Sequence, residues 1–355
     1  MFNFVRKYNM ISVLDHEFSQ LNVFLKKQHI SKIFILTDEN THHHCLPVLL
    51  GNMETDLPFE IIEIDPGEEM KTIETALQLW EILAEYEADR SSLLFNLGGG
   101  VITDLGGFVA STYKRGIRFI NLPTSLLGMC DAAVGGKTGV DLHSLKNMIG
   151  TFAMPEKVFL YPDFLKTLPF CELRSGFAEM LKHGLIADAE HWLQLTSLEN
   201  LTSEGITPFI SASTAIKNRI VEQDFHEENI RKTLNFGHTV GHAIESFFLQ
   251  KETPIAHGEA IAAGMLCEMY LSFEQHLISE TLLDSISLKI RKYFPQLSIE
   301  ENHFGHLLRL MQQDKKNSGS TINFSLINGI GSCIFNQQCS ENSILKSLNY
   351  YKNLY

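Results

Sequence analysis

The sequence predicts two domains, an α/β domain over residues 1–163 and a mainly α-helical domain over residues 164–355. Three observations support this fold class. Short apolar strands alternate with helices in the first half, three consecutive glycines follow one of these strands, and helical periodicity replaces the strands from about residue 164. The active site is expected in the cleft between the two domains, a common place for ligand sites.

The α/β domain is predicted to begin with two strands and a helix. Lys32–Thr37 and Phe59–Ile64 are short apolar runs rich in isoleucine and phenylalanine, which is typical of strands. Met70–Ala84 carries apolar residues at helical spacing, so we expect an amphipathic helix there.

A glycine-rich turn gives the first functional signal. The predicted buried strand Ser92–Leu97 is followed by Gly98-Gly99-Gly100 and then by a predicted helix over Val101–Ala110. Backbone amides at a glycine-rich helix N-terminus suit a pyrophosphate, so the turn favours a dinucleotide-binding domain. The match to G-x-G-x-x-G is incomplete, because its third glycine would fall at Thr103, and a plain tight turn is an equally good interpretation.

The next strand is expected to bring polar groups to the same edge of the sheet. Phe119–Leu122 ends at Pro123-Thr124-Ser125, whose hydroxyls are predicted to cap the following helix beside the glycines. Further on, Gly135-Gly136-Lys137-Thr138 imitates a nucleotide-triphosphate loop but has Asp131 where that loop needs its first glycine. We interpret it as an anion-binding segment that continues through Asp141, Lys146 and Asn147.

Helical segments dominate the second domain. Four long segments with helical spacing are Phe177–Ile186, Pro208–Glu222, Phe236–Leu249 and Glu259–His276. Few runs resemble strands, and no repeat or low-complexity linker marks the domain boundary.

A group of histidines in this domain indicates a metal site. His238 and His242 are four residues apart, so on a helix they lie one turn apart on the same face. His257 and the carboxylate of Glu179 complete a candidate set, since catalytic zinc sites use three protein ligands and leave one position open. The alternative is a pair of surface or core histidines without a metal.

Two neighbouring features complete the histidine analysis. Gly237 and Gly241 would let another element approach the face that carries His238 and His242. The more conspicuous run His42-His43-His44 lies among Asp38, Glu39 and Pro47, and we expect a turn with solvated side chains.

Composition describes an ordinary globular protein. The 355 residues are 44% apolar and 20% charged, which suits two domains with sizeable cores. Polar residues break every apolar run before it could span a membrane, and residues 1–7 lead into no signal core. The six cysteines lack C-x-x-C spacing, so free thiols in the cytoplasm are expected.

The net charge of −13 argues against a nucleic-acid partner, which would need a basic surface. Basic residues nevertheless concentrate in the motif-like segments, which favours an anionic small molecule as ligand. For any single lysine, solvent exposure remains the simpler interpretation. The basic residues concerned are Arg115, Lys137, Lys146, Lys182, Lys217, Arg231 and the pair Lys315-Lys316.

Together these motifs match a known family. The chain resembles 3-dehydroquinate synthase of the shikimate pathway over nearly its whole length, in that family's motif order. The resemblance implies an NAD- and zinc-dependent lyase that converts 3-deoxy-D-arabino-heptulosonate 7-phosphate into 3-dehydroquinate and phosphate. It also implies that NAD is regenerated in each turnover and that the enzyme is a homodimer. The matching segments are Gly98–Asp104, Leu122–Ser125, Gly135–Asp141, Lys146-Asn147, Glu179–Gly184, Arg231–His242 and His257–Glu259.

The resemblance also assigns site residues. It implies zinc ligands at Glu179, His238 and His257, and it leaves His242 as a polar catalytic group. The implied substrate-holding residues are Asp131, Lys137, Asn147, Lys182, Lys217, Arg231, Asn235, one of Lys315 and Lys316, and Arg115 from the neighbouring subunit. The implied NAD contacts are Gly67, Glu68, Lys71, Gly99, Gly100, Val101, Asp104, Thr124, Ser125, Lys137, Lys146, Phe164 and Thr167.

The sequence leaves several alternatives open. Thr103 and Pro66 depart from the family pattern and bear on NAD affinity. A related sugar phosphate cyclase acting on sedoheptulose 7-phosphate shares the NAD and zinc motifs, and a metal-dependent polyol dehydrogenase would share the fold but release NADH. A catalytically silent metal- and nucleotide-binding protein is a third possibility, and cobalt or another divalent metal could replace zinc.

Overall fold

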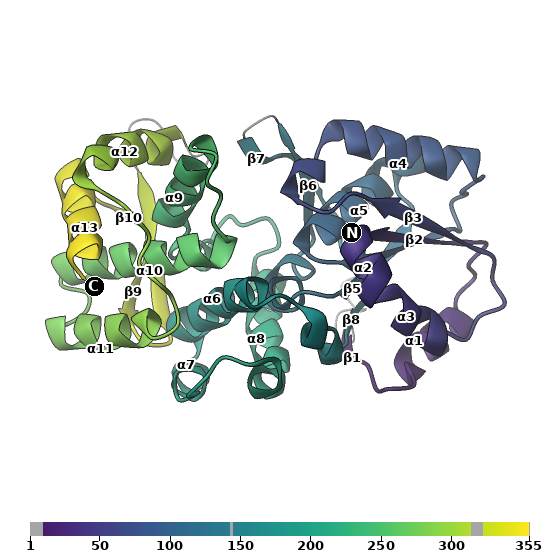
Figure 1. Ribbon diagram of the computed structural model, residues 1–355, viewed down its shortest axis with the longest axis horizontal. Coiled ribbons are helices and arrows are strands. Elements are labelled where there is room, and N and C mark those ends of the chain that lie inside the picture. Colours follow the sequence, from purple (N-terminus) through teal and green to yellow (C-terminus); the bar gives the residue numbers. More distant parts are fainter. Residues whose placement is uncertain (1–9, 143–144, 314–321, 355) are drawn as a thin grey trace. The chain divides into compact units, whose positions relative to one another are not determined.

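A computed structural model describes residues 10–142, 145–313 and 322–354. The chain falls into two compact units, Met1–Leu168 and Pro169–Tyr355, each considered by itself below (Figure 1). The predicted division after residue 163 stays a prediction. Lys315 and Lys316, one of which the resemblance assigns to the substrate, lie outside the described residues.

The first unit is built on a six-stranded parallel sheet. Its central strands are continuous apolar runs, as expected for a parallel sheet covered on both faces. The predicted strands over residues 32–37, 59–64, 92–97 and 119–122 are confirmed within one or two residues. In spatial order the strands are β1 (Ile11–Val13), β8 (Val158–Leu160), β5 (Arg118–Pro123), β4 (Leu93–Gly98), β2 (Ile33–Asp38) and β3 (Phe59–Ile64).

Helices α4 (Ile73–Glu85) and α5 (Gly100–Thr112) bury their apolar sides against this sheet, where Leu79, Leu105 and Phe34 share one core. Helix α4 begins later than predicted, because Glu68–Met70 forms a short 3-10 turn and Thr72 then accepts the Thr75 N–H at 3.2 Å. The other elements of this unit are α1 (Ser19–Lys27), α2 (Glu39–His44), α3 (Leu46–Asn52), the hairpin β6 (Lys137–Leu142) and β7 (Leu145–Phe152), and the short turns η3 (Tyr113–Arg115), η4 (Gly128–Ala132) and η5 (Pro162–Thr167).

The prediction of a turn at His42–His44 is wrong, because these residues end helix α2. The helix is held by a capping box, in which Asp38 accepts the Thr41 N–H at 2.8 Å and Thr41 accepts the Asp38 N–H at 3.0 Å. His43 and His44 are exposed as expected, whereas His42 is half-buried and pairs with Glu63.

The second unit is mainly α-helical, as predicted (Figure 1). Its central helix α10 (His257–Glu274) is buried along most of its length and contacts the helices around it. The neighbours are α6 (Phe170–Ala187), α9 (His238–Gln250), α11 (Glu280–Arg291) and α13 (Glu341–Asn353). The remaining elements are α7 (Ala189–Thr196), α8 (Ser203–Gln223), α12 (Phe304–Gln313), the turns η6 (Ile230–Asn235) and η7 (Glu301–His303), and a hairpin that the sequence did not predict, β9 (Asn323–Gly329) and β10 (Ser332–Gln338).

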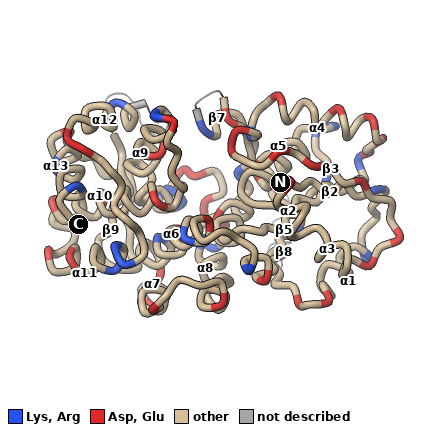
Figure 2. Tube along the Cα trace, viewed as in Figure 1, with Lys and Arg blue, Asp and Glu red and all other residues tan. Residues whose placement is uncertain are grey.

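Acidic and basic positions are interspersed along both units (Figure 2). No helix in the described ranges has the length and apolar character needed to cross a membrane. All six cysteines are free, as predicted. Cys45 and Cys267 are buried, and burial raises the pKa of the Cys45 thiol to about 12, so this thiol stays protonated and unreactive at neutral pH.

Candidate functional site

In the first unit, the glycine turn and the Thr124-Ser125 pair lie at one edge of the sheet. Strands β4 and β5 are in register up to Gly98 and Pro123, so both end at the same level. The Thr124 N–H donates to the Gly98 carbonyl at 3.1 Å, and Ser125 Oγ accepts the Gly128 N–H at 3.1 Å. The predicted meeting of these segments is therefore confirmed, as is the capping role of Ser125.

The start of helix α5 packs closely against the Thr124-Ser125 segment. Gly99 is its N-cap residue, and a Cβ there would lie 3.3 Å from Ser125 Oγ, so a side chain would crowd the edge of the sheet. Thr103, the departure from the dinucleotide pattern, is buried and donates to the Gly99 carbonyl at 3.2 Å. Close packing of helix on strand occurs one turn later, where a Cβ on Gly106 would collide with Asn96. The turn therefore keeps the geometry that suits a pyrophosphate.

A buried lysine links the Gly67-Glu68 turn to helix α5. Lys71 Nζ lies 2.7 Å from Asp104 Oδ2 and 2.7 Å from Asn147 Oδ1, while Lys146 Nζ lies 3.7 Å from Glu68 Oε1. Burial lowers the pKa of Lys71, but the carboxylates of Asp104 and Glu68 outweigh it and hold this pKa above the ordinary value. Several residues that the resemblance assigned to NAD are thus brought together around one permanent positive charge.

The other expected residues of this unit are spread over its loops and turns. Phe164 is buried in η5 and accepts a hydrogen bond from Thr167 Oγ1 at 3.3 Å. Asp131 lies in the π-helical turn η4, Lys137 begins strand β6, and Arg115 is exposed with a left-handed φ of 66°.

In the second unit, Glu179, His238 and His257 converge. Each residue offers one ligand atom, and these atoms lie within 4.8 Å of one another. Glu179 Oε1 lies 3.4 Å from His238 Nε2 and 3.7 Å from His257 Nε2. Donors about 2.0–2.1 Å from a tetrahedral zinc lie roughly 3.3 Å apart, so both separations from Glu179 are near that value, and three such ligands would leave one position open on the metal.

Two close helix contacts bring these ligands together. A Cβ on Gly258 would overlap Ser175, whose Oγ accepts the Gly258 N–H at 2.9 Å, so the first turn of α10 touches α6 one turn before Glu179. A Cβ on Gly264 would overlap the Gly237 carbonyl, which puts α10 against the start of α9. The prediction that Gly237 and Gly241 let another element approach is confirmed, because a Cβ on Gly241 would lie 2.9 Å from Ile261 and 3.0 Å from the Ala260 carbonyl of α10.

Hydrogen bonds orient both imidazoles. His238 Nδ1 lies 3.1 Å from the Phe236 carbonyl, and His257 Nδ1 lies 3.5 Å from Glu245 Oε2, so Nε2 of each ring is directed to Glu179. Burial lowers the pKa of His257, but the carboxylates of Glu245 and Glu179 raise it to about 10. A metal at this site therefore displaces a proton from His257 when it binds.

His242 lies beside this group. Its ring centroid is 5.1 Å from that of His238 and 6.0 Å from that of His257, so the prediction of two histidines on one helix face is confirmed. His242, Glu245 and His257 form a second possible ligand set. We favour the set around Glu179, because both Nε2 atoms lie at tetrahedral spacing from one fully buried carboxylate oxygen.

Three buried cations occupy elements that contact one another. Lys182 on α6, Lys217 on α8 and Arg231 on η6 are 1%, 7% and 2% exposed. Lys182 pairs with Glu179, and Arg231 donates from its guanidinium to the Phe225 carbonyl at 2.6 Å. Lysine and arginine are seldom so deeply buried unless they are paired, and a cluster of such cations can also hold an anionic ligand through charge-assisted hydrogen bonds.

Sequence reasoning did not identify three acidic residues here. Glu245 lies behind His257, Glu227 Oε1 accepts a hydrogen bond from Asn235 Nδ2 at 2.8 Å, and Glu268 accepts backbone bonds at the start of α9. A signal for Glu245 was present, because it follows His242 by three residues on the same helix. Glu268 follows His257 by eleven residues, about three helical turns, and so lies on the same face of α10.

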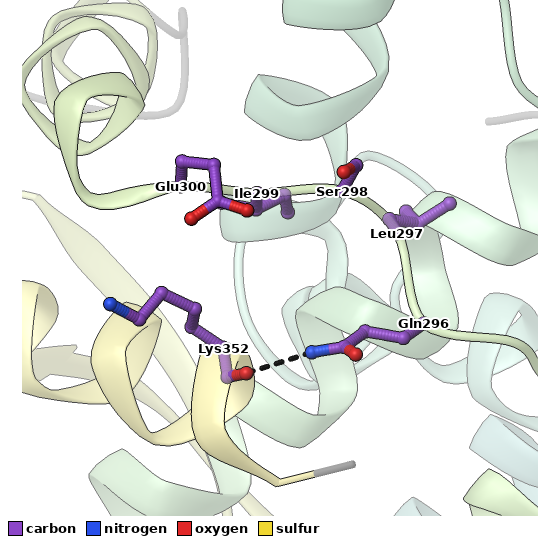
Figure 3. A pocket seen from close by; sticks show the side chains of 6 residues that line it. All are labelled: Gln296, Leu297, Ser298, Ile299, Glu300 and Lys352. Atoms are coloured by element: carbon purple, nitrogen blue, oxygen red, sulfur yellow. Dashed lines mark hydrogen bonds between the residues drawn. The ribbon is translucent and has the colours of Figure 1, made fainter.

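A hollow elsewhere in the second unit lacks comparable chemistry (Figure 3). Gln296 there donates to the Lys352 carbonyl at 2.8 Å. The lining residues are Gln296, Leu297, Ser298, Ile299, Glu300 and Lys352, and none of them belongs to the metal group.

Known proteins match this chain over most of its length. A family model described as 3-dehydroquinate synthase N-terminal matches residues 61–175, and one described as 3-dehydroquinate synthase C-terminal matches residues 176–317. The chain is 42% identical over 336 residues to the 3-dehydroquinate synthase of Parabacteroides distasonis, covering 94% of this chain and 95% of that protein. It is 40% identical over 322 residues to that of Campylobacter concisus, covering 90% and 92%.

A solved structure shares the fold of the whole chain. The chain is similar to a 2-epi-5-epi-valiolone synthase from Streptomyces hygroscopicus with NAD+ and Zn2+ bound, with a TM-score of 0.85 and 25% identity over 98% of this chain and 97% of that one.

Proposed function

The chain belongs to the 3-dehydroquinate synthase family, and from that premise we propose that Glu179, His238 and His257 hold the metal at which it converts 3-deoxy-D-arabino-heptulosonate 7-phosphate into 3-dehydroquinate and phosphate. The observation that carries the proposal is a pair of distances. Nε2 of His238 and Nε2 of His257 lie 3.4 Å and 3.7 Å from one buried carboxylate oxygen of Glu179, close to the separation between two ligands of the same tetrahedral metal. When bound, NAD accepts and returns a hydride, and the metal lowers the pKa of the substrate hydroxyl that it holds.

The buried cations bind the acidic groups of the substrate. Lys217 and Arg231 hold its carboxylate or phosphate through charge-assisted hydrogen bonds, which are the strong ones in a buried setting. Asn235 is held by Glu227 and offers its amide oxygen to a substrate hydroxyl. Lys137, Lys146 and Asn147 are the further residues assigned to the leaving phosphate, where positive charge stabilises the anion that forms.

His242 acts as a polar catalytic group beside the metal. Its ring lies next to His238 and is half-exposed, so it can exchange a proton with a substrate hydroxyl while the metal ligands cannot. The remaining steps, ring opening and an internal aldol closure, require mainly that the substrate is held in the reactive conformer.

The proposed site for NAD is the carboxyl edge of the sheet in the first unit. The amides of Gly99, Gly100 and Val101 receive the pyrophosphate, and Thr124 and Ser125 offer hydroxyls at the same edge. Lys71 and Asp104 support this edge through their ion pair. The active site in the cleft between the two domains stays a prediction from the sequence.

The homodimer and the role of Arg115 come from the family, and the cytoplasmic location comes from the free cysteines. The enzyme is proposed to be a cytoplasmic homodimer in which the exposed Arg115 reaches the substrate of the neighbouring subunit. Measuring the oligomeric state and the activity of mixed dimers that carry Arg115→Ala in one subunit tests this arrangement.

The proposed function is tested with purified enzyme, the seven-carbon acid phosphate, NAD and zinc. We expect phosphate and 3-dehydroquinate in equal amounts with no net NADH, abolished by a chelator and restored by zinc. Turnover of sedoheptulose 7-phosphate instead would indicate a related cyclase. NADH accumulation on polyols would indicate a dehydrogenase.

A further inference from the structure

Glu268 is a fully buried carboxylate that binds the start of helix α9. Its Oε2 accepts the Gly237 N–H at 2.7 Å, and its Oε1 accepts the Val240 N–H at 3.1 Å. A negative charge at this position complements the positive end of the helix dipole. The two bonds fix the N-terminal turn of the helix that begins with His238 and carries His242 one turn later.

One of these bonds reaches a metal ligand through a single peptide group. The Gly237 N–H belongs to the same peptide plane as the Phe236 carbonyl, because the two residues are neighbours. That carbonyl lies 3.1 Å from Nδ1 of His238. Glu268 therefore holds the N–H end of a rigid peptide whose C=O end holds the imidazole.

We propose that Glu268 is a positioning residue for the metal site, acting on His238 through the Phe236–Gly237 peptide. The carboxylate polarises this peptide, the Phe236 carbonyl becomes a stronger acceptor for Nδ1–H, and the ring keeps Nε2 directed to Glu179 and the metal. The inference rests on the proposed metal site. It corresponds to a carboxylate behind a metal-bound histidine, with one peptide group inserted between them.

A carboxylate suits this place better than an amide. Both N–H groups that face Glu268 are donors, and each oxygen of the carboxylate accepts one of them. A glutamine has one acceptor oxygen, so its NH2 group would face a backbone N–H. Glu268→Gln therefore removes the charge and one acceptor with little change of volume.

The first test compares zinc binding in two variants. Glu268→Gln is expected to weaken zinc affinity about 10- to 100-fold in chelator competition, as for loss of an outer-shell partner, and to shift the visible spectrum of the cobalt-loaded protein. Ile290→Ala, a buried residue of α11, serves as the control for lost stability and should change neither property. Equal zinc affinity and an unchanged cobalt spectrum in Glu268→Gln would overturn the proposal.

The second test uses the native protein, in case Glu268→Gln does not fold. Labelling with 13C-carbonyl phenylalanine and 15N-glycine selects only Phe–Gly amides, and the sequence contains two, at Gly237 and Gly305. Zinc on Nε2 makes Nδ1–H more acidic and strengthens the chain of bonds, so the Gly237 amide proton should move downfield on zinc addition. Gly305 lies in α12 with open space around it and should not move.

The outcomes separate this inference from the proposed metal site. Zinc bound at one per chain without a change at Gly237 would overturn the relay and leave the metal site intact. No zinc binding by the native protein would overturn both.

Discussion

The carboxylate of Glu245 lies 3.5 Å from Nδ1 of His257, while Nε2 of the same ring lies 3.7 Å from Glu179. Glu245 therefore holds the Nδ1 side of the ring, and Nε2 is directed to Glu179, as in metal sites where a carboxylate fixes the tautomer of a histidine ligand. His238 is held by the Phe236 carbonyl in the same sense. The two imidazoles are thus oriented by groups that do not themselves bind the metal in the proposed set.

Replacing Glu245 tests the importance of this orientation. Glu245→Gln still offers an acceptor to Nδ1 but loses the charge, so we expect zinc affinity to fall by about 10-fold or more. Chelator competition at fixed pH measures the change. Glu252→Gln, an exposed residue after α9, is the control and should bind zinc like the native chain. If Glu245→Gln also matched the native affinity, Glu245 would have no part in orienting the ligand.

The contact between α10 and α6 is predicted to require glycine. A Cβ on Gly258 would overlap the backbone of Ser175, so Gly258→Ala should lower the free energy of unfolding by about 1–3 kcal/mol and also weaken zinc binding by displacing His257. Gly305→Ala is the control. It adds a Cβ to open space in helix α12, where alanine is favoured, and should be neutral or stabilising by up to about 1 kcal/mol. Denaturant titrations measure the free energy of unfolding of both variants. Equal changes in Gly258→Ala and Gly305→Ala would contradict the close contact between α10 and α6.

Much of this architecture could be predicted from the sequence. Strands β2 to β5 and helix α5 have continuous apolar runs or clear turn signals, and the glycine edge follows from the parallel order of β4 and β5. The histidines and Glu179 were candidates from the sequence itself, but the choice of Glu179, His238 and His257 as ligands came from the family resemblance, since no local pattern says which residues meet in space.

Other features depend on contacts that a linear pattern does not contain. Helix α2 is too short for an apolar period and is held by the capping pair Asp38 and Thr41. Glu268 has the sequence context of a buried apolar helix, and only the approach of α9 at Gly264 gives its carboxylate two partners.

Lys71 is predicted to support the cofactor edge. Its ammonium joins Asp104 to Asn147, so Lys71→Gln removes the charge partner of the half-buried Asp104 carboxylate. If the lost charged hydrogen bond, worth about 1.5–3 kcal/mol, is felt in full at the proposed cofactor edge, NAD binding should weaken roughly 10- to 100-fold in calorimetry. Lys27→Gln, exposed on α1, is the control. An NAD affinity equal to that of the control would show that the ion pair does not shape the cofactor edge.

His191 is predicted to make the enzyme sensitive to acid. It is 2% exposed, and neither ring nitrogen has a hydrogen-bond partner within the described part of the chain. Burial lowers the pKa of His191, and Asp188 only partly offsets this effect. The folded state therefore binds fewer protons, so the stabilisation is present above the ordinary pKa of about 6.5 and is lost as the pH falls below it.

His191→Phe removes this titration. Between about pH 7 and pH 5 its free energy of unfolding should fall less steeply than that of the native chain, by up to about 1.4 kcal/mol per pH unit for one proton. Urea titrations across this range measure both slopes. Parallel slopes of the two chains would mean that His191 binds a proton as readily in the folded state as in the unfolded state.

We assign the metal to Glu179, His238 and His257 and leave His242 for the substrate. The most direct measurement is the zinc content of purified Glu179→Ala, His238→Ala, His257→Ala and His242→Ala, together with their turnover of the heptulosonate phosphate. We predict that the first three variants lose zinc and activity. His242→Ala should keep about one zinc per chain while turning over about 100-fold more slowly, as for loss of a general acid or base. Loss of zinc from His242→Ala, with zinc retained in Glu179→Ala, would contradict the account and assign the metal to His242, Glu245 and His257 instead.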